Sequence, residues 1–542
     1  MSMNKKPDNE KIISYASGTE AREDLLREIK KIKQETVDIP LIIGGKQLKT
    51  DEVAEVRCPH DHACILARVH LANSEQLLKA VDAALEAHVR WAFLEWQHRV
   101  AIFKKAADLL SQKERMRHVA ATMMNLSKNP YEAENDVAEL IDFFRFNDFF
   151  VQQISTENPN QGEYEVNRLD WRPLEGFVFA VSPFNFYSLG GNLSTTSAML
   201  GNVVLWKPAT NAAFANYEIM KLLTHAGLPS GVINFVPFRS EHADVLLKHP
   251  DFAGLHFTGS YETLVKLWMD IAKYIPKYKN FPRIVGETGG KDFIFVHHSA
   301  DVRHVAMNII RGGFESQGQK CSAASRVYIP KSMWNTMKTL LKGEVSKVTY
   351  GPVDDFQNFM GAVIDEDAFN KVVSYIRYVQ SNPDYEIISG GTYDKTKGWF
   401  VAPTLIKTSN PQGKLMSEEI FGPVVTIFVY DDDKYEEMLQ LCDSTSPYGL
   451  TGSIFATDRE AITTAETILR FSAGNFYIND KPTGSVVGRQ PFGGARHSGT
   501  NDKTGLWLSL LRWVNPRAIK ETTTPVYEWK RNYMEDSQVD RN

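Results

Sequence analysis

The sequence predicts an α/β protein with more than one lobe, built on parallel sheet with helices on both faces. From residue 176 onward, short apolar runs alternate with helical stretches, and the runs are 177–181, 203–206, 233–236, 254–257 and 293–296. Strands separated by helices indicate right-handed crossovers and therefore parallel pairing. A chain of 542 residues is too long for one ordinary hydrophobic core, so two or three lobes are expected.

The remaining segments extend this pattern toward both ends of the chain. Apolar residues recur at helical spacing in 77–85 and 100–110, so the N-terminal third is expected to be largely helical. A second strand–helix series follows from about 326 to 476, and the tail 519–542 is polar and typical of an arm.

The composition is that of a globular protein with no preference for nucleic acid. Hydrophobic residues make up 43% of the chain and charged residues 23%, the usual balance of a soluble domain. The net charge of −5 and the pI of about 6.3 oppose a nucleic-acid partner, which would need a dominant basic patch. No apolar run approaches the roughly 18 residues that a membrane span requires, so no membrane partner is expected.

Residues 1–33 mix acidic and basic side chains and contain no apolar core. They lack the pattern of a signal peptide, and they lack the Arg-rich, acid-poor character of a transit peptide. We expect a solvated N-terminal helix and a cytoplasmic protein, with the mitochondrial matrix as the alternative location.

Four cysteines in so long a chain do not form a disulfide framework, and a reducing compartment is expected. Two of them, Cys58 and Cys64, enclose two histidines and suggest a metal site. A structural zinc site uses a second half-site elsewhere, however, and Pro59 with Asp61 is typical of a hairpin tip. We therefore expect no metal.

Cys321 differs from the other cysteines because it lies in a polar, glycine-containing stretch, 315–322 (ESQGQKCS). The helix that follows the run 293–296 ends near Gly318 and is expected to deliver Cys321 on a turn. A reactive cysteine needs a neighbouring base or dipole, donors for oxyanion charge and access for the substrate. Lys320 would favour the thiolate if its ammonium group points inward.

Three further segments are candidates for the same site. Residues 286–291 (GETGGK) place a carboxylate among glycines, where the backbone can approach a ligand closely. Residues 182–186 (SPFNF) end a predicted strand, at the position where open α/β sheets bind ligands. Residues 417–423 (SEEIFGP) combine two acids with an aromatic residue and a Gly-Pro turn.

Together and in this order, these segments resemble the aldehyde dehydrogenase superfamily. The lysine of 206–208 (WKP) and the turn 257–260 (FTGS) complete the set, and the resemblance covers about residues 40–525. The Gly-x-Gly-x-x-Gly fingerprint of standard dinucleotide-binding domains is missing. The resemblance accounts for this, because it implies a variant Rossmann cofactor domain, an α/β catalytic domain and a small β oligomerisation arm.

The resemblance implies a covalent mechanism that begins at Cys321. Its thiol would attack the aldehyde, while the Asn185 amide and the backbone N–H of Cys321 hold the developing oxyanion. Losing one such donor typically costs about 2.7–4 kcal/mol of barrier. Hydride transfer to the nicotinamide would leave a thioester, and Glu287 would act as general base on the water that hydrolyses it.

The same resemblance implies an NAD site. Lys207 would bind the adenosine ribose hydroxyls, and Ser260, at a helix N-terminus, would lie near the pyrophosphate. The expected cofactor-binding residues are Ser182, Lys207, Gly259, Ser260, Glu419 and Phe421, of which the last two would contact the nicotinamide ribose and ring. Many NAD-specific relatives have a glutamate three residues after the lysine, where this chain has the neutral Thr210. NAD is the expected cofactor, and use of NADP is a second hypothesis.

A narrower likeness indicates the substrate. Residues 140–146 (LIDFFRF), 473–481 (AGNFYINDK) and 488–496 (GRQPFGGAR) resemble the branch that oxidises L-glutamate γ-semialdehyde to L-glutamate. This semialdehyde comes from Δ1-pyrroline-5-carboxylate, and its oxidation is the second step of proline catabolism. It carries an α-carboxylate and an ammonium group, so its pocket needs donors for one and an acceptor for the other.

The likeness to this branch assigns substrate-binding roles. The residues expected to bind the carboxylate are Lys320, Ser322, Gly484 and Ser485. Phe186 and Phe492 would sandwich the aliphatic stem, burying apolar surface at about 25 cal/mol per Å². Glu139 would meet the ammonium group, unless it is simply paired with its neighbour Arg145.

The expected organisation has three parts and a subunit partner. A cofactor domain spans 1–152 and 173–288, a catalytic domain spans 289–514, and an arm combines 153–172 with 515–542. The unpaired edge of such an arm would be a liability in a monomer, so a homodimer or a dimer-based oligomer is expected.

Three alternatives stay open. The first is an aldehyde dehydrogenase for another acidic semialdehyde, such as succinate semialdehyde, which would leave Glu139 without a partner. The second is a cofactor-independent thiol hydrolase built on Cys321, Asn185 and Glu287, for which Lys207 would be accidental. The third is a non-catalytic protein on the same scaffold, which the intact nucleophile, base and oxyanion donor oppose.

Overall fold

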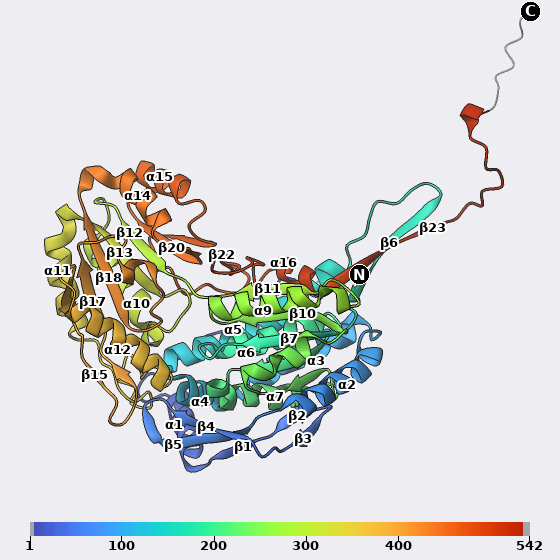
Figure 1. Ribbon diagram of the computed structural model, residues 1–542, viewed down its shortest axis with the longest axis horizontal. Helices are drawn as coiled ribbons and strands as arrows, with labels where there is room; N and C mark the ends of the chain where they lie inside the picture. The colour runs from blue at the N-terminus through green and yellow to red at the C-terminus, as the bar shows by residue number, and fades with distance from the viewer. Residues whose placement is uncertain (1–4, 535–542) are drawn as a thin grey trace, which may run out of the picture.

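The computed structural model describes residues 5–534 and is built on two large sheets, with a long ribbon projecting from one end (Figure 1). Within these residues each large sheet has seven strands, and parallel pairing dominates both. The α/β fold class predicted from alternating strands and helices is therefore confirmed. Among the helices of this part of the chain, none combines the length and the apolar character needed to cross a membrane.

The strands of the first large sheet are β2 (Leu41–Ile43), β3 (Lys46–Leu48), β7 (Phe177–Ser182), β8 (Val203–Pro208), β9 (Ile233–Phe235), β10 (Phe252–Thr258) and β11 (Arg283–Glu287). Their order across the sheet is β11-β10-β7-β8-β9-β2-β3. The first five pair in parallel, and the β2–β3 hairpin adds an antiparallel edge. Four of the apolar runs predicted to be strands lie in this sheet.

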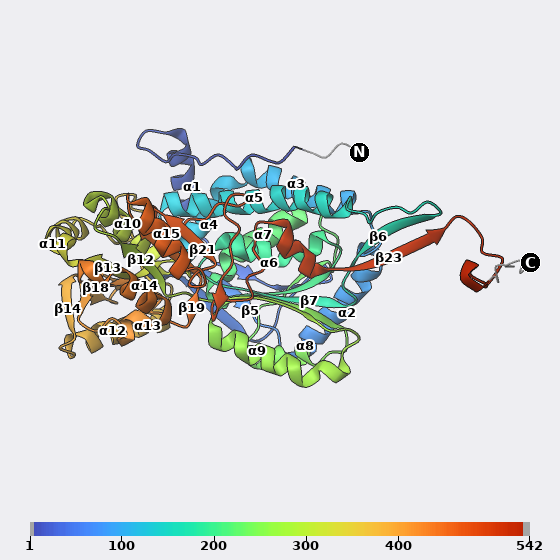
Figure 2. The same cartoon turned by 90° about the horizontal axis from the view of Figure 1, so that it is seen from above.

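Helices cover both faces of this sheet (Figure 2). One face carries α6 (Tyr187–Met199) and α7 (Ala213–Ala226), backed by α3 (Trp96–Ser111), α4 (Arg115–Leu126) and α5 (Pro130–Ser155). The other face carries α2 (Ser74–Trp91), α8 (Ala243–Leu247) and α9 (Tyr261–Tyr274). The side chains between these layers form one large hydrophobic cluster, in which Phe179 and Trp206 are almost fully buried.

The strands of the second large sheet are β12 (Asp292–Val296), β13 (Ala324–Pro330), β14 (Tyr385–Ser389), β17 (Thr404–Thr408), β18 (Val424–Tyr430), β20 (Thr451–Phe455) and β21 (Asn475–Ile478). Their order is β14-β17-β18-β13-β12-β20-β21, and β14 alone is antiparallel to its neighbour. The helices of this part are α10 (Val302–Phe314), α11 (Lys331–Val345), α12 (Glu366–Gln380), α13 (Lys414–Ser417), α14 (Tyr435–Ser444) and α15 (Arg459–Ile468). The chain changes sheets between Glu287 and Asp292.

Smaller elements complete the described chain. A three-stranded sheet combines β1 (Val37–Ile39), β5 (Asp61–His70) and β4 (Val53–Cys58), and two-stranded pairs join β15 (Tyr393–Asp394) to β16 (Phe400–Val401) and β19 (Tyr448–Gly449) to β22 (Ala495–Arg496). The remaining helices are α1 (Glu20–Gln34) and α16 (Trp507–Leu510). The hairpin tip predicted between Cys58 and Cys64 is present, since Cys58 pairs with Asp61.

Local sequence explains where the longer helices begin. The Asn129 side chain accepts the Glu132 N–H, and Pro130 occupies the first turn of α5, where its missing N–H does no harm. Ser260 caps α9 in the same way, as expected for a residue at a helix N-terminus. Asp301 caps α10, which ends shortly before Cys321.

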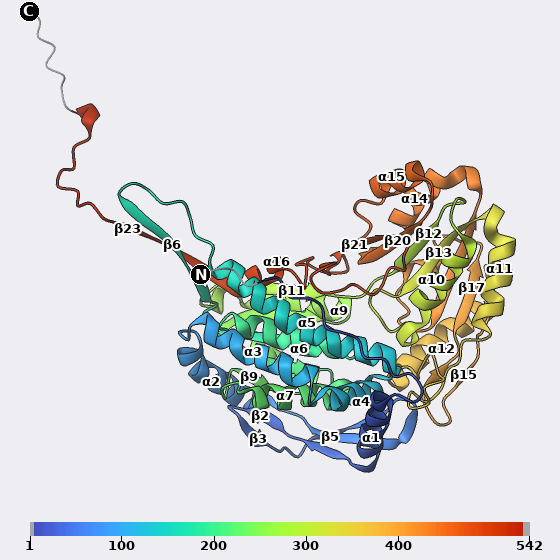
Figure 3. The ribbon, with the colours of Figure 1, turned by 180° about the vertical axis from the view of Figure 1, so that it is seen from behind.

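The prediction of a solvated helix at the N-terminus was wrong for residues 5–18, which are not helical. This segment runs over α5, and α1 follows it (Figure 3). The Ile13 N–H and the Tyr15 hydroxyl both donate to the buried Glu134, at 2.8 and 2.7 Å. Binding to these partners replaces the hydrogen bonds that a helix would supply, so the segment is held in an extended form.

The projecting ribbon draws one strand from each of the two segments expected to form an arm, although residues 153–155 of the first segment belong to α5. Strand β6 (Glu165–Pro173) pairs antiparallel with β23 (Val514–Thr522) along its whole length. Residues 535–542 of the expected arm lie outside the described residues. The division of the chain into three domains stays a prediction, although the change of sheet falls close to the expected boundary at 288.

Candidate active site

Four predicted site residues lie at one edge of the first sheet. Ser182, Lys207 and Glu287 occupy the ends of β7, β8 and β11, and Gly259 directly follows β10. Because these four strands are parallel neighbours, their carboxyl ends meet at the same edge. The topology therefore gathers residues that are more than a hundred positions apart in sequence.

Cys321 reaches this edge from the second sheet. After α10 the backbone kinks through left-handed conformations at Ser316 and Gln317, with φ of 50° and 56°, and continues to the half-buried Cys321. Residues other than glycine adopt this conformation only when their surroundings hold them there. The buried Glu132 carboxylate does so by accepting the Ser316 N–H at 2.6 Å.

The thiol of Cys321 lies close to three carboxyl groups. Burial, and then the carboxyl groups of Asp292, Glu419 and Glu287, raise the pKa of the thiol well above its usual range. The Lys320 ammonium group lies 3.0 Å from Glu315 and is engaged by that carboxylate. The hypothesis that Lys320 favours the thiolate stays a prediction, and in this structure its ammonium group is paired with Glu315.

Glu287 has one fixed and one open carboxyl oxygen. Its Oε2 accepts the Gly494 N–H at 3.0 Å, whereas its buried Oε1 has no hydrogen-bond partner among residues 5–534. Burial raises the pKa of this carboxyl to about 8, and the Gly494 N–H opposes the rise. A carboxyl group with such a pKa can take up and release protons close to neutral pH.

The Asn185 side chain is buried beside the turn that carries the nucleophile. Its Nδ2 donates to the Gln319 carbonyl oxygen at 3.1 Å, two residues before Cys321. An amide group has two N–H donors, so one remains for a ligand.

A cavity of about 430 Å³ lies beside Cys321. Its size is within the usual range for small-molecule sites. Its lining includes Cys321, Glu287 and all of the predicted substrate-binding residues, which are Glu139, Phe186, Lys320, Ser322, Gly484, Ser485 and Phe492. The structure thus brings together in one cavity nine residues that the sequence analysis proposed separately.

The part of the cavity near Ser322 offers donors for an anion. Ser322 and Thr483 share a hydroxyl–hydroxyl hydrogen bond of 2.8 Å, and Gly484 follows with a φ of 95°, which favours glycine. Two ammonium groups, from Lys320 and Lys481, flank this region, and both pair with the Glu315 carboxylate. This part of the cavity therefore presents hydroxyl groups and ammonium groups to a ligand.

Glu139 offers a carboxyl group from another side of the cavity. Its Oε2 accepts the Ser188 hydroxyl at 2.6 Å, and burial raises its pKa to about 7. Arg145, the alternative partner considered from the sequence, instead lies 2.5 Å from Glu10. The carboxyl group of Glu139 is thus left for a cationic ligand group.

Phe186 is held by a buried ion pair that the sequence analysis missed. The Lys128 ammonium group lies 4.0 Å from the Phe186 ring and 2.6 Å from Asp136, which also accepts the N–H groups of Tyr187 and Ser188. No motif marks this pair, because the N–H groups that Asp136 accepts lie 51 and 52 residues further along the chain. Thr483 was also missed, although it directly precedes Gly484.

The residues proposed for the adenosine side of a dinucleotide fit that use. The Lys207 ammonium group is largely buried and makes no ion pair within residues 5–534, and burial lowers its pKa to about 8. Such a group is suited to ribose hydroxyls, which can accept hydrogen bonds from it. Ser260 caps the 14-residue helix α9 and is exposed, while the Ser182 hydroxyl accepts the Trp206 indole N–H at 2.9 Å.

The residues proposed for the nicotinamide side lie in the loop between α13 and β18. Glu419 accepts the Gly290 N–H at 2.9 Å and packs so closely on Gly289 that a side chain there would collide with it. Phe421 has a φ of 61°, a strained conformation for an aromatic residue, and its ring meets Phe184 edge to face. Strain of this kind is concentrated at functional sites.

The segment from Cys58 to Cys64 was considered as a metal site because it holds two cysteines and two histidines. Cys58 Sγ lies 3.3 Å from the His60 ring, and both side chains are buried. Within residues 5–534 no group of three or more His, Cys, Asp or Glu side chains is arranged to hold a metal ion.

Comparison with known families identifies the class of protein. The model of the aldehyde dehydrogenase family matches residues 47–518, and the chain belongs to this family. The resemblance inferred from the motifs is therefore confirmed.

Individual relatives match over nearly the whole chain. The mitochondrial delta-1-pyrroline-5-carboxylate dehydrogenase of Dictyostelium discoideum is 48% identical over 98% of this chain and 96% of its own length. The mitochondrial delta-1-pyrroline-5-carboxylate dehydrogenase of Homo sapiens is 43% identical, over 97% and 94%. Among solved structures, the delta-pyrroline-5-carboxylate dehydrogenase of Mycobacterium tuberculosis bound with NAD has a TM-score of 0.95 and 44% identity, with 99% of each chain covered.

Proposed function

We propose that this protein oxidises L-glutamate γ-semialdehyde, formed from Δ1-pyrroline-5-carboxylate, to L-glutamate with NAD⁺ as hydride acceptor. The observation that carries the proposal is the composition of one cavity, which holds Cys321, an anion-binding region at Ser322 and the free carboxyl group of Glu139. These groups match the aldehyde, the carboxylate and the ammonium group of the substrate. The names of the relatives support the same reaction, since they are delta-1-pyrroline-5-carboxylate dehydrogenases.

The substrate would be oriented by its two charged ends. Ser322, Gly484 and Ser485 would donate hydrogen bonds to the carboxylate, with the positive charge of Lys320 close by. Glu139 would accept hydrogen bonds from the ammonium group, which favours the ionised form of this carboxyl. The stem between them would lie against Phe186 and Phe492, so that the aldehyde carbon faces Cys321.

The first chemical step would be attack of Cys321 Sγ on the aldehyde carbon, in which the carbonyl π bond breaks and the thiol releases its proton to water. The carbonyl oxygen becomes an oxyanion, which the second N–H of Asn185 and the backbone N–H of Cys321 would stabilise. NAD⁺, when bound, accepts the hydride of the former aldehyde carbon. Lys207 and Ser260 would hold its adenosine and pyrophosphate parts, and Glu419 and Phe421 its nicotinamide riboside.

The second step would be hydrolysis of the thioester on Cys321. Glu287, with one oxygen fixed by Gly494 and the other open, would remove a proton from water as the water attacks the thioester carbon. The C–S bond then breaks, the leaving thiolate of Cys321 takes up the proton held by Glu287, and glutamate is released.

The decisive experiment follows NADH formation with Δ1-pyrroline-5-carboxylate and, in parallel, with succinate semialdehyde, for the wild type and Cys321→Ala. We expect turnover of the first substrate that is lost in the variant. Turnover of succinate semialdehyde alone would retain the mechanism and overturn the substrate assignment. If neither aldehyde leads to reduction of NAD⁺, the thiol hydrolase or the non-catalytic protein on the same scaffold would be favoured.

The assembly proposed for the protein is a homodimer or a dimer-based oligomer. Strands β6 and β23 form a ribbon that extends away from the body, with exposed outer residues such as Tyr164 and Val166 (Figure 1). Backbone groups along such an edge are available to a second subunit. Sedimentation analysis tests this assignment: the wild type should sediment as a dimer or larger species, and a chain without residues 516–542, which lacks most of β23, should sediment as a monomer.

The proposed location is the cytoplasm, with the mitochondrial matrix as the alternative because the cited relatives from Dictyostelium and human are mitochondrial by name. Imaging of the full chain in its own cells distinguishes the two.

A further inference from the structure

The N-terminal segment, residues 5–13, forms part of the wall of the active-site cavity. Asn9, Glu10 and Ile12 line the cavity together with residues of α5 and of the loop 484–489. Neither the motifs nor the proposed mechanism assign these three residues a role.

Asn9 connects two walls of the cavity. Its Nδ2 donates to Asp142 Oδ2 on α5 at 2.8 Å and to the carbonyl oxygen of Val487 at 2.9 Å. Its Oδ1 accepts from Arg489 Nε at 3.0 Å, and the Glu10 N–H donates to the other oxygen of Asp142 at 2.7 Å. Every polar atom of the Asn9 side chain is therefore used to join α5 to the loop 484–489.

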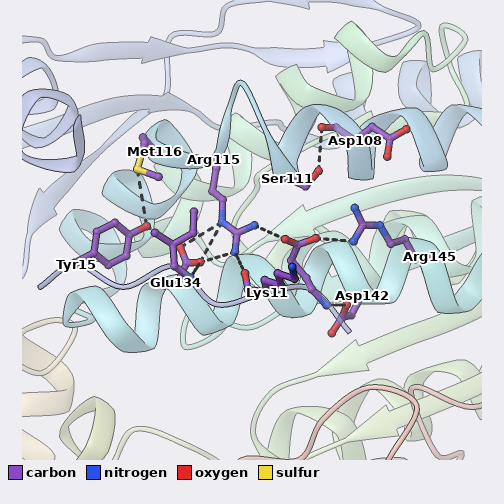
Figure 4. A network of polar contacts seen from close by, with 11 residues as sticks. Lys11, Tyr15, Asp108, Ser111, Arg115, Met116, Glu134, Asp142 and Arg145 are labelled. Atoms are coloured by element: carbon purple, nitrogen blue, oxygen red, sulfur yellow. Dashed lines mark hydrogen bonds and ion pairs between the residues drawn. The ribbon is translucent and has the colours of Figure 1, made fainter. Parts of the chain in front are cut away.

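The segment that follows Asn9 is itself firmly attached, and Figure 4 shows Lys11 and Tyr15 in one polar network with Arg115. The Glu10 carboxylate lies 2.9 Å from Arg115 and 2.5 Å from Arg145, one guanidinium group on each oxygen. Arg115 also donates to the Lys11 carbonyl oxygen at 2.7 Å. These bonds hold the backbone beside Asn9 in place, so the position of the Asn9 side chain is well defined.

The two walls joined by Asn9 carry the two charge-binding parts of the cavity. Asp142 lies three residues after Glu139 on α5, so the two side chains project from neighbouring positions of one helix face. Val487 lies three residues after Gly484 in the loop that also carries Ser485. The link from Asp142 through Asn9 to Val487 thus spans the cavity between the proposed ammonium site and the proposed carboxylate site.

We propose that Asn9 is a positioning residue for substrate specificity, which sets the separation between Glu139 on α5 and the carboxylate-binding loop 484–489. This inference rests on the proposed function, because it needs a substrate with both charged groups. An aldehyde that lacks them uses only Cys321, Asn185 and Glu287, and it is indifferent to that separation.

The test compares Asn9→Ala with Asp8→Ala, a matched control one residue away whose side chain is 94% exposed. L-Glutamate is titrated into each protein by calorimetry, and kcat and KM are measured for glutamate semialdehyde and for propanal. For Asn9→Ala we expect about tenfold weaker glutamate binding and about tenfold higher KM for glutamate semialdehyde. Its kcat/KM for propanal should stay within about twofold of the control.

A second variant guards against an effect of Asn9 on folding. Lys6→Met removes the bond from Lys6 Nζ to the Gly488 carbonyl oxygen, 3.1 Å long, and should shift glutamate binding in the same direction by a smaller factor. An equal loss for both aldehydes, or an unchanged affinity for glutamate, overturns the role of Asn9. A wild type that does not oxidise glutamate semialdehyde overturns the proposed function itself, and the inference with it.

Discussion

Glu287 Oε2 accepts a hydrogen bond from the Gly494 N–H at 3.0 Å, while Glu287 Oε1 is buried without a hydrogen-bond partner among residues 5–534. One oxygen is thereby fixed in direction, and the other is free to accept a proton from a ligand or from water. The same burial raises the pKa of the group to about 8, so its charge changes close to neutral pH. The rate of any step that uses Glu287 as a base should therefore depend on pH.

We expect thioester hydrolysis to become faster as the pH rises through about 8. Because burial raises the pKa of Glu287, the base form is scarce below that pH and grows by about tenfold per unit until the group is ionised. Stopped-flow measurement of NADH separates a first burst from the later steady rate, and the steady rate should carry this dependence. In Glu287→Gln the burst should remain, and the steady rate should be slow and nearly independent of pH. An equally steep pH dependence in that variant would assign the base to another group.

The second prediction concerns Glu139, whose carboxyl group accepts the Ser188 hydroxyl at 2.6 Å. Glu139→Gln keeps the size and the hydrogen bond but removes the charge that would meet an ammonium group. A charge-assisted hydrogen bond contributes about 1.5–3 kcal/mol, so kcat/KM for glutamate semialdehyde should fall by at least about tenfold. Succinate semialdehyde, which has no ammonium group, serves as the internal control and should lose less than about twofold. Equal losses for the two substrates would place the ammonium group elsewhere.

The sequence predicted those parts of the site that depend on local signals. Glu287 lies at the end of a strand, Cys321 on a turn after a helix, and Ser260 at a helix N-terminus, and each position leaves a recognisable pattern of neighbours. Asn9 leaves none, because its partners Asp142 and Val487 lie 133 and 478 residues away.

The same reason explains the wrong expectation for residues 5–18. A segment rich in charges has the composition of a solvated helix, but its actual conformation is decided by buried acceptors on α5. The engagement of Lys320 by Glu315 is likewise a tertiary contact, since two charges five residues apart in an irregular turn have no fixed relation in sequence. Long-range polar pairing is therefore what sequence patterns did not reveal.

A third prediction concerns stability. Arg115 is 1% exposed in its side chain and is paired with the fully buried Glu134 as well as with Glu10. Removing one partner of a buried ion pair leaves an uncompensated charge and typically costs about 3–5 kcal/mol. Arg115→Met should therefore lower the melting temperature clearly, as measured by scanning calorimetry.

The matched control for this prediction is Arg27→Met, because Arg27 pairs with Asp24 but is 65% exposed. Exposed pairs contribute about 0–1 kcal/mol, so this variant should melt close to the wild type. Adding Glu134→Gln to Arg115→Met should restore part of the loss, since glutamine is neutral and still accepts the Tyr15 hydroxyl. Equal melting temperatures for the two arginine variants would contradict the importance of the buried pair.

The last prediction concerns the choice of cofactor at Lys207 and Thr210. The Lys207 ammonium group is buried without an ion pair in the described chain, so its replacement by methionine removes a donor that only a ligand would use. Lys207→Met should raise the KM for NAD⁺ by about tenfold and leave the KM for the aldehyde unchanged, as steady-state kinetics with each substrate varied in turn would measure.

Thr210, three residues after Lys207 at the start of a short 3₁₀ turn, is neutral and carries no charge that would repel a 2′-phosphate. Thr210→Glu should therefore lower kcat/KM for NADP⁺ by more than about tenfold through like-charge repulsion, with NAD⁺ almost unaffected. Parallel kinetics with both cofactors measure this, and a wild type that never reduces NADP⁺ would show that a group other than residue 210 excludes the phosphate.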